Sequence, residues 1–106
     1  MTVAQHYYSS EPERDGFEEL LERYVKELPE RAGALRAARQ NEDAVEAESM
    51  LHQLAGSLGL YGYRPLEEQC RAQLNRLRNG EEFHAVAPAI DALLQELERV
   101  RARPAL

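Results

Sequence analysis

One histidine, His52, stands among unusually small residues in the stretch from Glu48 to Cys70. Read as a helix that turns about 100° per residue, this stretch has an apolar stripe from which His52 faces away. The residues that we place on the His52 face by helical spacing are Glu48, Ser49, Ala55, Gly56 and Gly59. A glycine inside a helix costs roughly 1 kcal/mol relative to alanine. We therefore interpret Gly56 and Gly59 as clearance, which lets another protein bring a bulky group directly onto the imidazole.

The chemistry suited to such a histidine is nucleophilic. An imidazole is largely uncharged near pH 7, so one ring nitrogen can attack an electrophile. Glu48, one turn earlier, could hold the Nδ1 proton and leave Nε2 to react, or it could be an ordinary solvated side chain. Gln53 is the flexible polar side chain beside His52 on the C-terminal side. The sequence leaves both roles of Glu48 open.

The order of residues after His52 resembles a known signature. The positions that carry the resemblance are His52, Leu54, Gly56, Ser57, Leu60, Gly62, Leu66 and Cys70. They are similar to the histidine-containing phosphotransfer (Hpt) domain of two-component phosphorelays, commonly written HxLKGS, a helix end with glycine, then LxxxC. The resemblance implies a single Hpt-like domain over residues 1–106, with His52 as the phosphoacceptor. It implies a receiver domain of a response regulator or hybrid sensor kinase as partner, with Mg²⁺ and the catalytic groups on that partner, so no metal or cofactor is expected here.

The sequence departs from the signature at one position. Where the family often carries lysine, three residues after the histidine, this chain has Ala55. We group Ala55 with Glu48, Gln53, Gly56 and Gly59 as access and docking residues around His52. Arginines of the following segment could simply form a solvated face, or they could replace the missing lysine or meet the acidic pocket of a receiver; they are Arg71, Arg76 and Arg78.

Composition narrows the classes of protein. The chain has 106 residues, which suits one domain with one modest core. A formal net charge of -6 argues against nucleic-acid binding, which relies on many Lys and Arg side chains. No apolar run approaches the roughly 20 residues needed to span a bilayer. With a single cysteine, Cys70, and no secretory signal pattern, we expect the protein to be in the cytoplasm. We also expect it to be a monomer.

Helical spacing predicts an all-α fold, an antiparallel up-down-up-down bundle of four helices. The first helix begins near Asp15 or Gly16, with Pro29 producing a kink or dividing it. The second follows the turn 40–43, where either Asn41 or Asp43 can cap it and Asp43 with Glu46 has capping-box spacing, and it ends near residues 61–62. The third contains Pro65 in its first turn and ends at residues 79–80. The fourth runs over residues 82–101, with Pro88 kinking it or marking its start.

The two chain ends are harder to assign. Residues 1–15 contain Val3, Tyr7 and Tyr8, and could form a short cap helix over one end of the bundle. We expect the tail 102–106 to be frayed.

Two other possible sites have simpler explanations. Cys70 lies in phase with Leu66 and Leu74, so we expect it to pack in the core. Glu81 and His84 have Glu-x-x-His spacing, but a bundle metal site needs a second such pair and further glutamates, which are missing from the sequence.

The leading hypothesis is a phosphorelay intermediate that accepts a phosphoryl group on His52 from a receiver aspartate and passes it to another response regulator. The first alternative is an Hpt-like module that docks a receiver or kinase without transferring phosphate. The second, a purely structural helical dimer, would need a second apolar stripe that the helices do not have.

Overall fold

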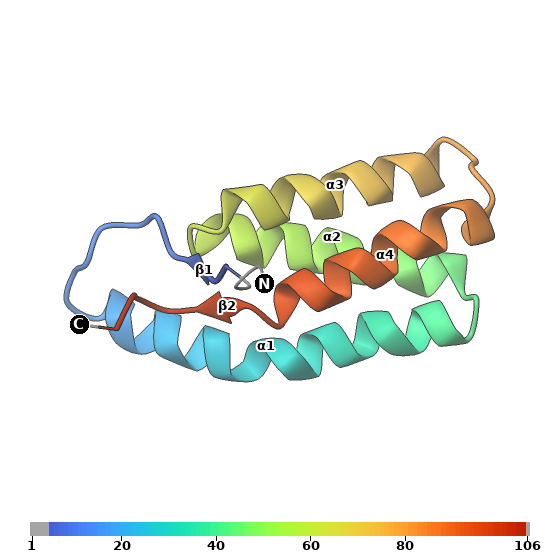
Figure 1. The fold of residues 1–106 in the computed structure, drawn as a ribbon. Helices are drawn as coiled ribbons and strands as arrows, with labels where there is room; N and C mark the ends of the chain where they lie inside the picture. The colour runs from blue at the N-terminus through green and yellow to red at the C-terminus, as the bar shows by residue number, and fades with distance from the viewer. Residues whose placement is uncertain (1–4, 106) are drawn as a thin grey trace.

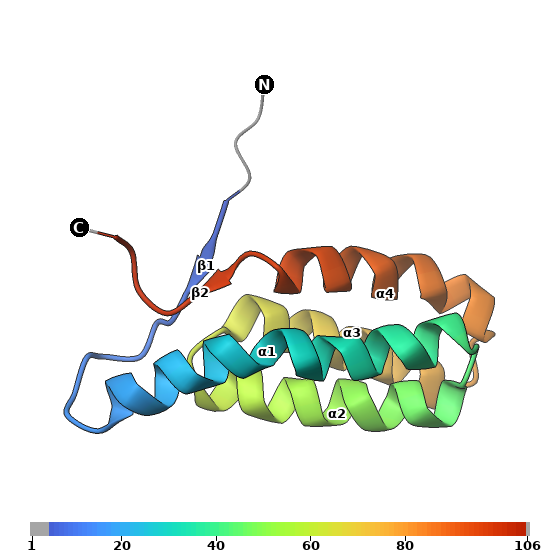
Figure 2. The same ribbon diagram turned by 90° about the horizontal axis from the view of Figure 1, so that it is seen from below.

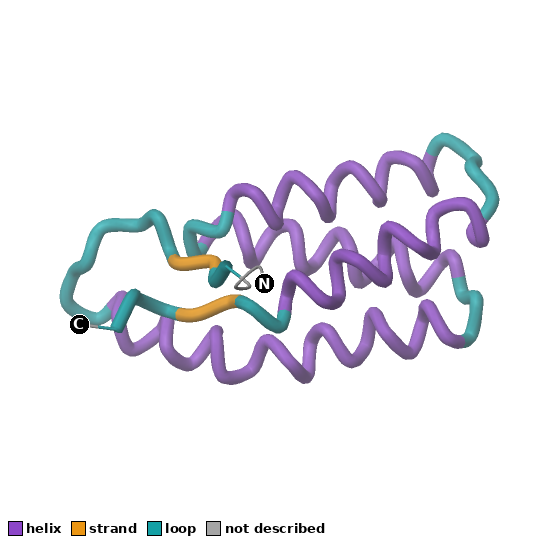
Figure 3. Tube along the Cα trace, in the orientation of Figure 1, coloured by secondary structure: helices purple, strands orange, loops and turns teal. Residues whose placement is uncertain are grey.

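The computed structural model describes residues 5–105, and four helices account for most of them. The helices are α1 (Phe17–Gln40), α2 (Ala44–Leu60), α3 (Arg64–Arg78) and α4 (Phe83–Leu97). Two short strands, β1 (Tyr7–Tyr8) and β2 (Val100–Arg101), pair in parallel (Figures 1 and 3). The predicted four-helix bundle is confirmed, with a small two-stranded addition that was not predicted.

The helices surround one core. The chain crosses the molecule along each helix in turn, and successive helices run in opposite directions (Figures 1 and 2). α1 and α3 each pack against both α2 and α4. Side chains from all four helices meet in the centre, among them Leu21, Leu35, Leu51, Leu58, Leu66, Ile90 and Leu93. None of the helices in residues 5–105 combines the length and apolar character that crossing a bilayer requires.

Local sequence signals set the helix ends. The Asp43 carboxylate accepts a hydrogen bond from the Glu46 backbone N–H at 3.0 Å, which caps α2 as predicted. α2 and α3 are each followed by a glycine with positive φ, Gly62 and Gly80, both at 87°. This left-handed conformation suits glycine because it has no Cβ. Pro65 lies in the first turn of α3, where a missing N–H costs nothing.

Two prolines lie inside helices without ending them. α1 is continuous through Pro29, and α4 begins at Phe83, so Pro88 does not mark its start. Both prolines lie on the exposed side. The helices continue because the residues on either side of each proline pack on the same core, for example Leu28 and Ala32 in α1.

The predictions for the chain ends were wrong. Residues 5–16 form no cap helix, and Tyr7 and Tyr8 form β1 instead; Val3 lies outside the described residues. α4 ends at Leu97, and Val100 is buried in a strand beside Tyr7. A helix of a few residues is costly to nucleate, and Pro12 interrupts the N-terminal segment, so pairing with β2 is the available alternative.

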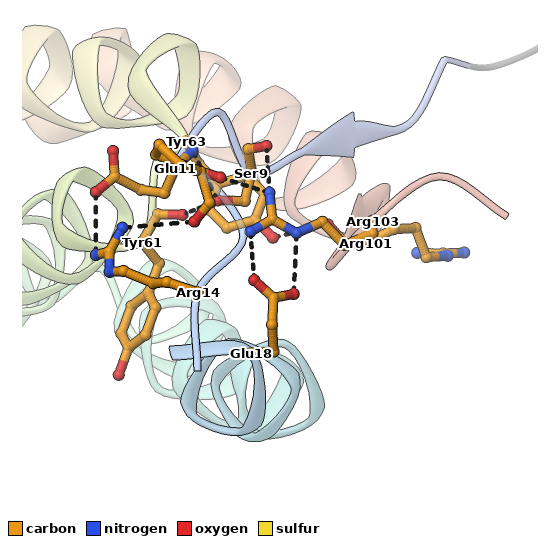
Figure 4. Close-up of polar contacts among 9 residues, drawn as sticks. Ser9, Glu11, Arg14, Glu18, Tyr61, Tyr63, Arg101 and Arg103 are labelled. Carbon is orange, nitrogen blue, oxygen red and sulfur yellow. Dashed lines mark hydrogen bonds and ion pairs between the residues drawn. The ribbon is translucent and has the colours of Figure 1, made fainter. Parts of the chain in front are cut away.

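Two residues of the tail, Ala102 and Arg103, are held in place, and the Ala102 carbonyl accepts a hydrogen bond from the Ser9 N–H at 3.3 Å. Arg103 donates to the Glu18 carboxylate at 2.6 and 3.1 Å and to the backbone carbonyls of Ser9 and Glu11 at 3.2 and 2.6 Å (Figure 4). Tyr63 donates its hydroxyl to the Arg101 carbonyl at 2.7 Å. We call this region the terminal clasp: residues 7–11 and 100–103, the turn 61–63, and Glu18. The prediction of a frayed tail is wrong for residues 102 and 103, because these side-chain bonds join distant parts of the chain.

Candidate functional site

His52 lies on the exposed face of α2, as predicted. Leu51 and Leu54 beside it are buried and fix the rotation of the helix. Gly56, one turn after His52, is exposed, and a Cβ built there meets no atom within 4 Å. The space over Gly56 is therefore open, so a bulky group can approach the imidazole from this side.

Gly59 has a different environment from the predicted one. A Cβ at Gly59 would lie 2.8 Å from the carboxylate of Glu67, which reaches across from α3. The space beside Gly59 is filled by the chain itself, so the clearance predicted at this position is wrong. Gly59 instead lets the Glu67 side chain lie close to the α2 backbone.

Ala55 is also placed differently from the prediction. It has 0 % exposure and belongs to the hydrophobic core. A residue three positions after His52 lies about 60° away around the helix, and this rotation is enough to turn Ala55 inward. Ala55 therefore does not form part of a docking surface, and the position of the missing lysine is an interior one.

The two polar neighbours of His52 make contacts with other residues. Gln53 is exposed and donates its amide to the Ser49 hydroxyl at 3.3 Å. The half-buried Glu48 carboxylate lies 3.8 Å from Nε of Arg78 on α3. In the part of the chain that the structure describes, Glu48 thus pairs with Arg78 rather than holding the His52 ring.

The family follows from the sequence as a whole. Residues 19–103 match the model of the Hpt domain family, a range that includes His52 and reaches from α1 past β2. The chain belongs to the Hpt domain family. Hpt domains take part in histidine phosphotransfer in two-component signalling, and they interact with receiver domains of response regulators or with kinases. No curated protein and no solved structure gives a significant match.

In this Hpt domain, the α2 segment that follows Glu48 and carries His52 has no charged side chain of the Asp, Glu, Lys or Arg type. Residues 49–60 contain no Asp, Glu, Lys or Arg, although charged residues make up 30 % of the chain. Two apolar side chains at the ends of the His52 face, Val45 and Leu60, are 79 % and 67 % exposed. Neither was predicted to be exposed on this face, although their spacing of seven and eight residues from His52 places them on its side of the helix.

A tyrosine pair supports the C-terminal half of α2 in the Hpt domain. The Tyr24 hydroxyl of α1 lies 2.7 Å from the Ser57 hydroxyl, which in turn donates to the Leu54 carbonyl at 3.2 Å. The Tyr24 ring stacks on Tyr61, with ring centroids 4.4 Å apart. Burial raises the pKa of Tyr24 to about 12, so its hydroxyl keeps its proton at neutral pH and can donate to Ser57.

The two remaining candidate residues, Cys70 and His84, are not arranged for catalysis or metal binding. Cys70 has 0 % exposure, which confirms its predicted place in the core, and burial raises the pKa of its thiol to about 12. Its thiol therefore stays protonated and unreactive. His84 is exposed and lies 3.2 Å from Glu82. Within residues 5–105, no three His, Cys, Asp or Glu side chains are grouped to hold a metal ion.

Proposed function

We propose that this Hpt domain is a phosphorelay intermediate, in which His52 accepts a phosphoryl group from a receiver-domain aspartate and passes it to another response regulator. The observation that carries the proposal is the exposed His52 beside open space at Gly56. A receiver presents its aspartyl phosphate from within a pocket, so the acceptor needs this free approach.

The reaction requires only a nucleophile from this chain. The Nε2 lone pair of His52 attacks phosphorus, a P–N bond forms, and the P–O bond to the aspartate breaks to leave a carboxylate. In the next step the phosphoryl group moves from Nε2 to the aspartate of a second receiver. The resemblance to Hpt domains assigns Mg²⁺ and the catalytic groups to the receiver, so the proposal includes no metal, cofactor or kinase activity here.

The surface around His52 supports a receiver as the docking partner. The uncharged residues 49–60 can be covered by another protein without desolvating a charge. Val45 and Leu60 add exposed apolar area at the two ends of this face. On the α3 side, Arg78 lies beside Glu48 and Arg71 beside Glu67, and both suit the acidic pocket of a receiver.

We further propose that the domain acts as a monomer in the cytoplasm. A dimer formed through α2 would cover His52 and block access by a receiver. The single cysteine is buried and unpaired, which is compatible with a reducing compartment.

A transfer assay tests the proposal. The protein is incubated with radiolabelled phosphorylated receiver domains, and we expect acid-labile, alkali-stable label on the wild type. His52→Gln should take no label, while its free energy of unfolding changes by no more than about 0.5 kcal/mol, because the side chain is exposed. His84→Gln is the matched control and should take label normally.

Two results would contradict the proposal. Label that persists on His52→Gln would place the phosphoacceptor elsewhere. A wild-type protein that binds phosphorylated receivers without taking label would instead support the alternative, an Hpt-like module that docks a receiver or kinase without transfer.

A further inference from the structure

α2 provides no positive charge to a phosphoryl group on His52. The helix Ala44–Leu60 contains no Lys or Arg, and Ala55, where the signature has lysine, is buried. A phosphoryl group adds close to two negative charges at pH 7. Any side chain that neutralises this charge within the protein must therefore come from a neighbouring helix.

α3 lies beside α2 along the whole His52 stretch. Arg78 of α3 contacts Glu48, one turn before His52, and Glu67 of α3 covers Gly59, about two turns after it. Eleven residues separate the two contacts on each helix, so the segments between them run side by side. The α3 segment 67–78 carries three arginines, Arg71, Arg76 and Arg78.

Two of these arginines are already engaged. Arg71 donates twice to the Glu67 carboxylate, at 2.9 and 3.1 Å. Arg76 donates to Glu81, to Gln73 and to the Ala85 carbonyl, at 2.9–3.2 Å. If either guanidinium turned away to bind a phosphoryl group, it would lose at least two of these hydrogen bonds.

Arg78 has a looser contact. Its Nε lies 3.8 Å from the Glu48 carboxylate, which is beyond hydrogen-bond distance, and its side chain is 53 % exposed. Ion pairs of this kind contribute little to stability and exchange easily. On the opposite flank of α2, Arg31 lines a hollow of about 160 Å³ with Gln53 and Ser57. That hollow lies farther around the helix from His52 than Glu48 does.

We propose that Arg78 is the positioning residue for the phosphoryl group on His52, and that it exchanges the Glu48 carboxylate for the phosphoryl oxygens. Residues one turn apart on a helix have Cβ atoms about 5–6 Å apart, so Glu48 and His52 are neighbours. Phosphorylation places a second negative group beside Glu48, and this repels the carboxylate and attracts the guanidinium. The planar donor fork of arginine matches phosphate oxygens.

The inference rests on the proposed function, but its test needs no receiver. Phosphoramidate phosphorylates exposed histidines directly, and His6→Asn with His84→Asn leaves His52 as the one histidine. The second ionisation of the phosphohistidine is then followed by ³¹P NMR as a function of pH. A nearby cation favours the dianion, so the phosphoryl pKa should rise by about half a unit in Arg78→Gln.

Three further variants separate a charge contact from a structural effect. Arg78→Lys should keep most of the lowered phosphoryl pKa, and Arg71→Gln should leave it as in the parent protein. Glu48→Gln removes the competing carboxylate and should lower the phosphoryl pKa further. Thermal melts of all variants record whether they fold.

The inference is overturned if the phosphoryl pKa is the same in Arg78→Gln and the parent, or if Arg71→Gln raises it equally. If Arg78→Gln does not fold, Arg78→Lys and Glu48→Gln decide, and an unchanged pKa in Glu48→Gln counts against the exchange. A protein that takes phosphate from phosphoramidate but none from any receiver refutes the proposed function, while the ³¹P result for Arg78 stands. Failure of His52 to react with phosphoramidate refutes both.

Discussion

The terminal clasp and the His52 face use polar side chains in opposite ways. In the clasp, Ser9 donates to the Tyr61 carbonyl at 2.6 Å, and Arg103 bonds both the Glu18 carboxylate and two backbone carbonyls (Figure 4). Around His52, residues 49–60 contain no Asp, Glu, Lys or Arg, and the adjacent ion pair between Glu48 and Arg78 is long. The hydrogen-bonded side chains of the clasp hold the chain ends in place, whereas the exposed His52 remains available to a partner.

The two regions meet on the same helix. α2 is followed by Tyr61, whose carbonyl the clasp binds and whose ring stacks on Tyr24. The buried leucines in the middle of α2 pack in the core, and the space over Gly56 on the outer side of the helix is open. Changes in the clasp should therefore affect stability, and changes on the open face should affect transfer.

Replacing Ala55, the buried residue next to the His52 face, should have the largest effect on stability. Ala55→Lys forces a long charged side chain into a fully buried position, and we expect a loss of about 2–4 kcal/mol in the free energy of unfolding. Gln53→Lys, at an exposed position nearby, is the control and should change it by less than about 0.5 kcal/mol. Urea titrations of both variants measure this. Equal stabilities would mean that Ala55 is accessible.

Removing a buried hydroxyl in the clasp should have the next largest effect. Ser9→Ala leaves the Tyr61 carbonyl without its donor and the Glu11 N–H without its acceptor, so we expect a loss of about 1–2 kcal/mol. Ser10→Ala is the control and should lose less stability, because the Gly62 carbonyl still accepts a hydrogen bond from the Ser10 backbone N–H. The transfer rate should be the same in both variants. A slower rate in Ser9→Ala alone would show that the clasp and the His52 face are coupled.

Filling the open space over Gly56 should give a smaller change in stability, of opposite sign. Gly56→Ala should raise the free energy of unfolding by up to about 1 kcal/mol, since a Cβ there meets nothing within 4 Å. Gly56→Leu should keep part of this gain, while transfer from a phosphorylated receiver falls steeply from Ala to Leu. The matched control is Gly33→Ala in α1, where a Cβ also meets nothing, and transfer should stay normal. Destabilisation by both Gly56 substitutions would refute the clearance interpretation.

The smallest effect concerns the acid stability of the clasp. The hydrogen bond from Arg103 lowers the pKa of the Glu18 carboxyl below its usual range. Its contribution to stability is therefore complete above the ordinary glutamate pKa of about 4.3, and is lost as pH falls through the lower folded-state value. The melting temperature of Glu18→Gln should lie below that of the wild type at pH 7 and approach it in acid. Glu19→Gln, at the exposed neighbour, should show no such pH dependence.

Several features were predictable because they depend on residues close together in the chain. The cap of α2 needs only the Asp43 side chain and the N–H of Glu46. The turn after the C-terminal end of α2 needs only a residue that tolerates positive φ, which is Gly62. The exposure of His52 follows from the angle between it and the apolar stripe. The same periodicity placed Cys70 in the core.

The features that were wrongly predicted depend on distant parts of the chain. Val100 fits both a helix stripe and a buried strand, and its pairing with Tyr7 decides between them. Arg103 is ordered by Glu18 and by the carbonyls of the N-terminal segment, which no local pattern reveals.

By itself, the sequence determined four amphipathic helices, the ends of all but the last, and a histidine turned away from the core. Only the tertiary structure decided which flank of that histidine is open: Gly56 faces free space, Gly59 lies under Glu67, and Ala55 is buried. The physical reason is that helical spacing gives each residue an angle around its own axis. Whether a given angle faces solvent depends on where the neighbouring helix packs, and that is set by the core as a whole.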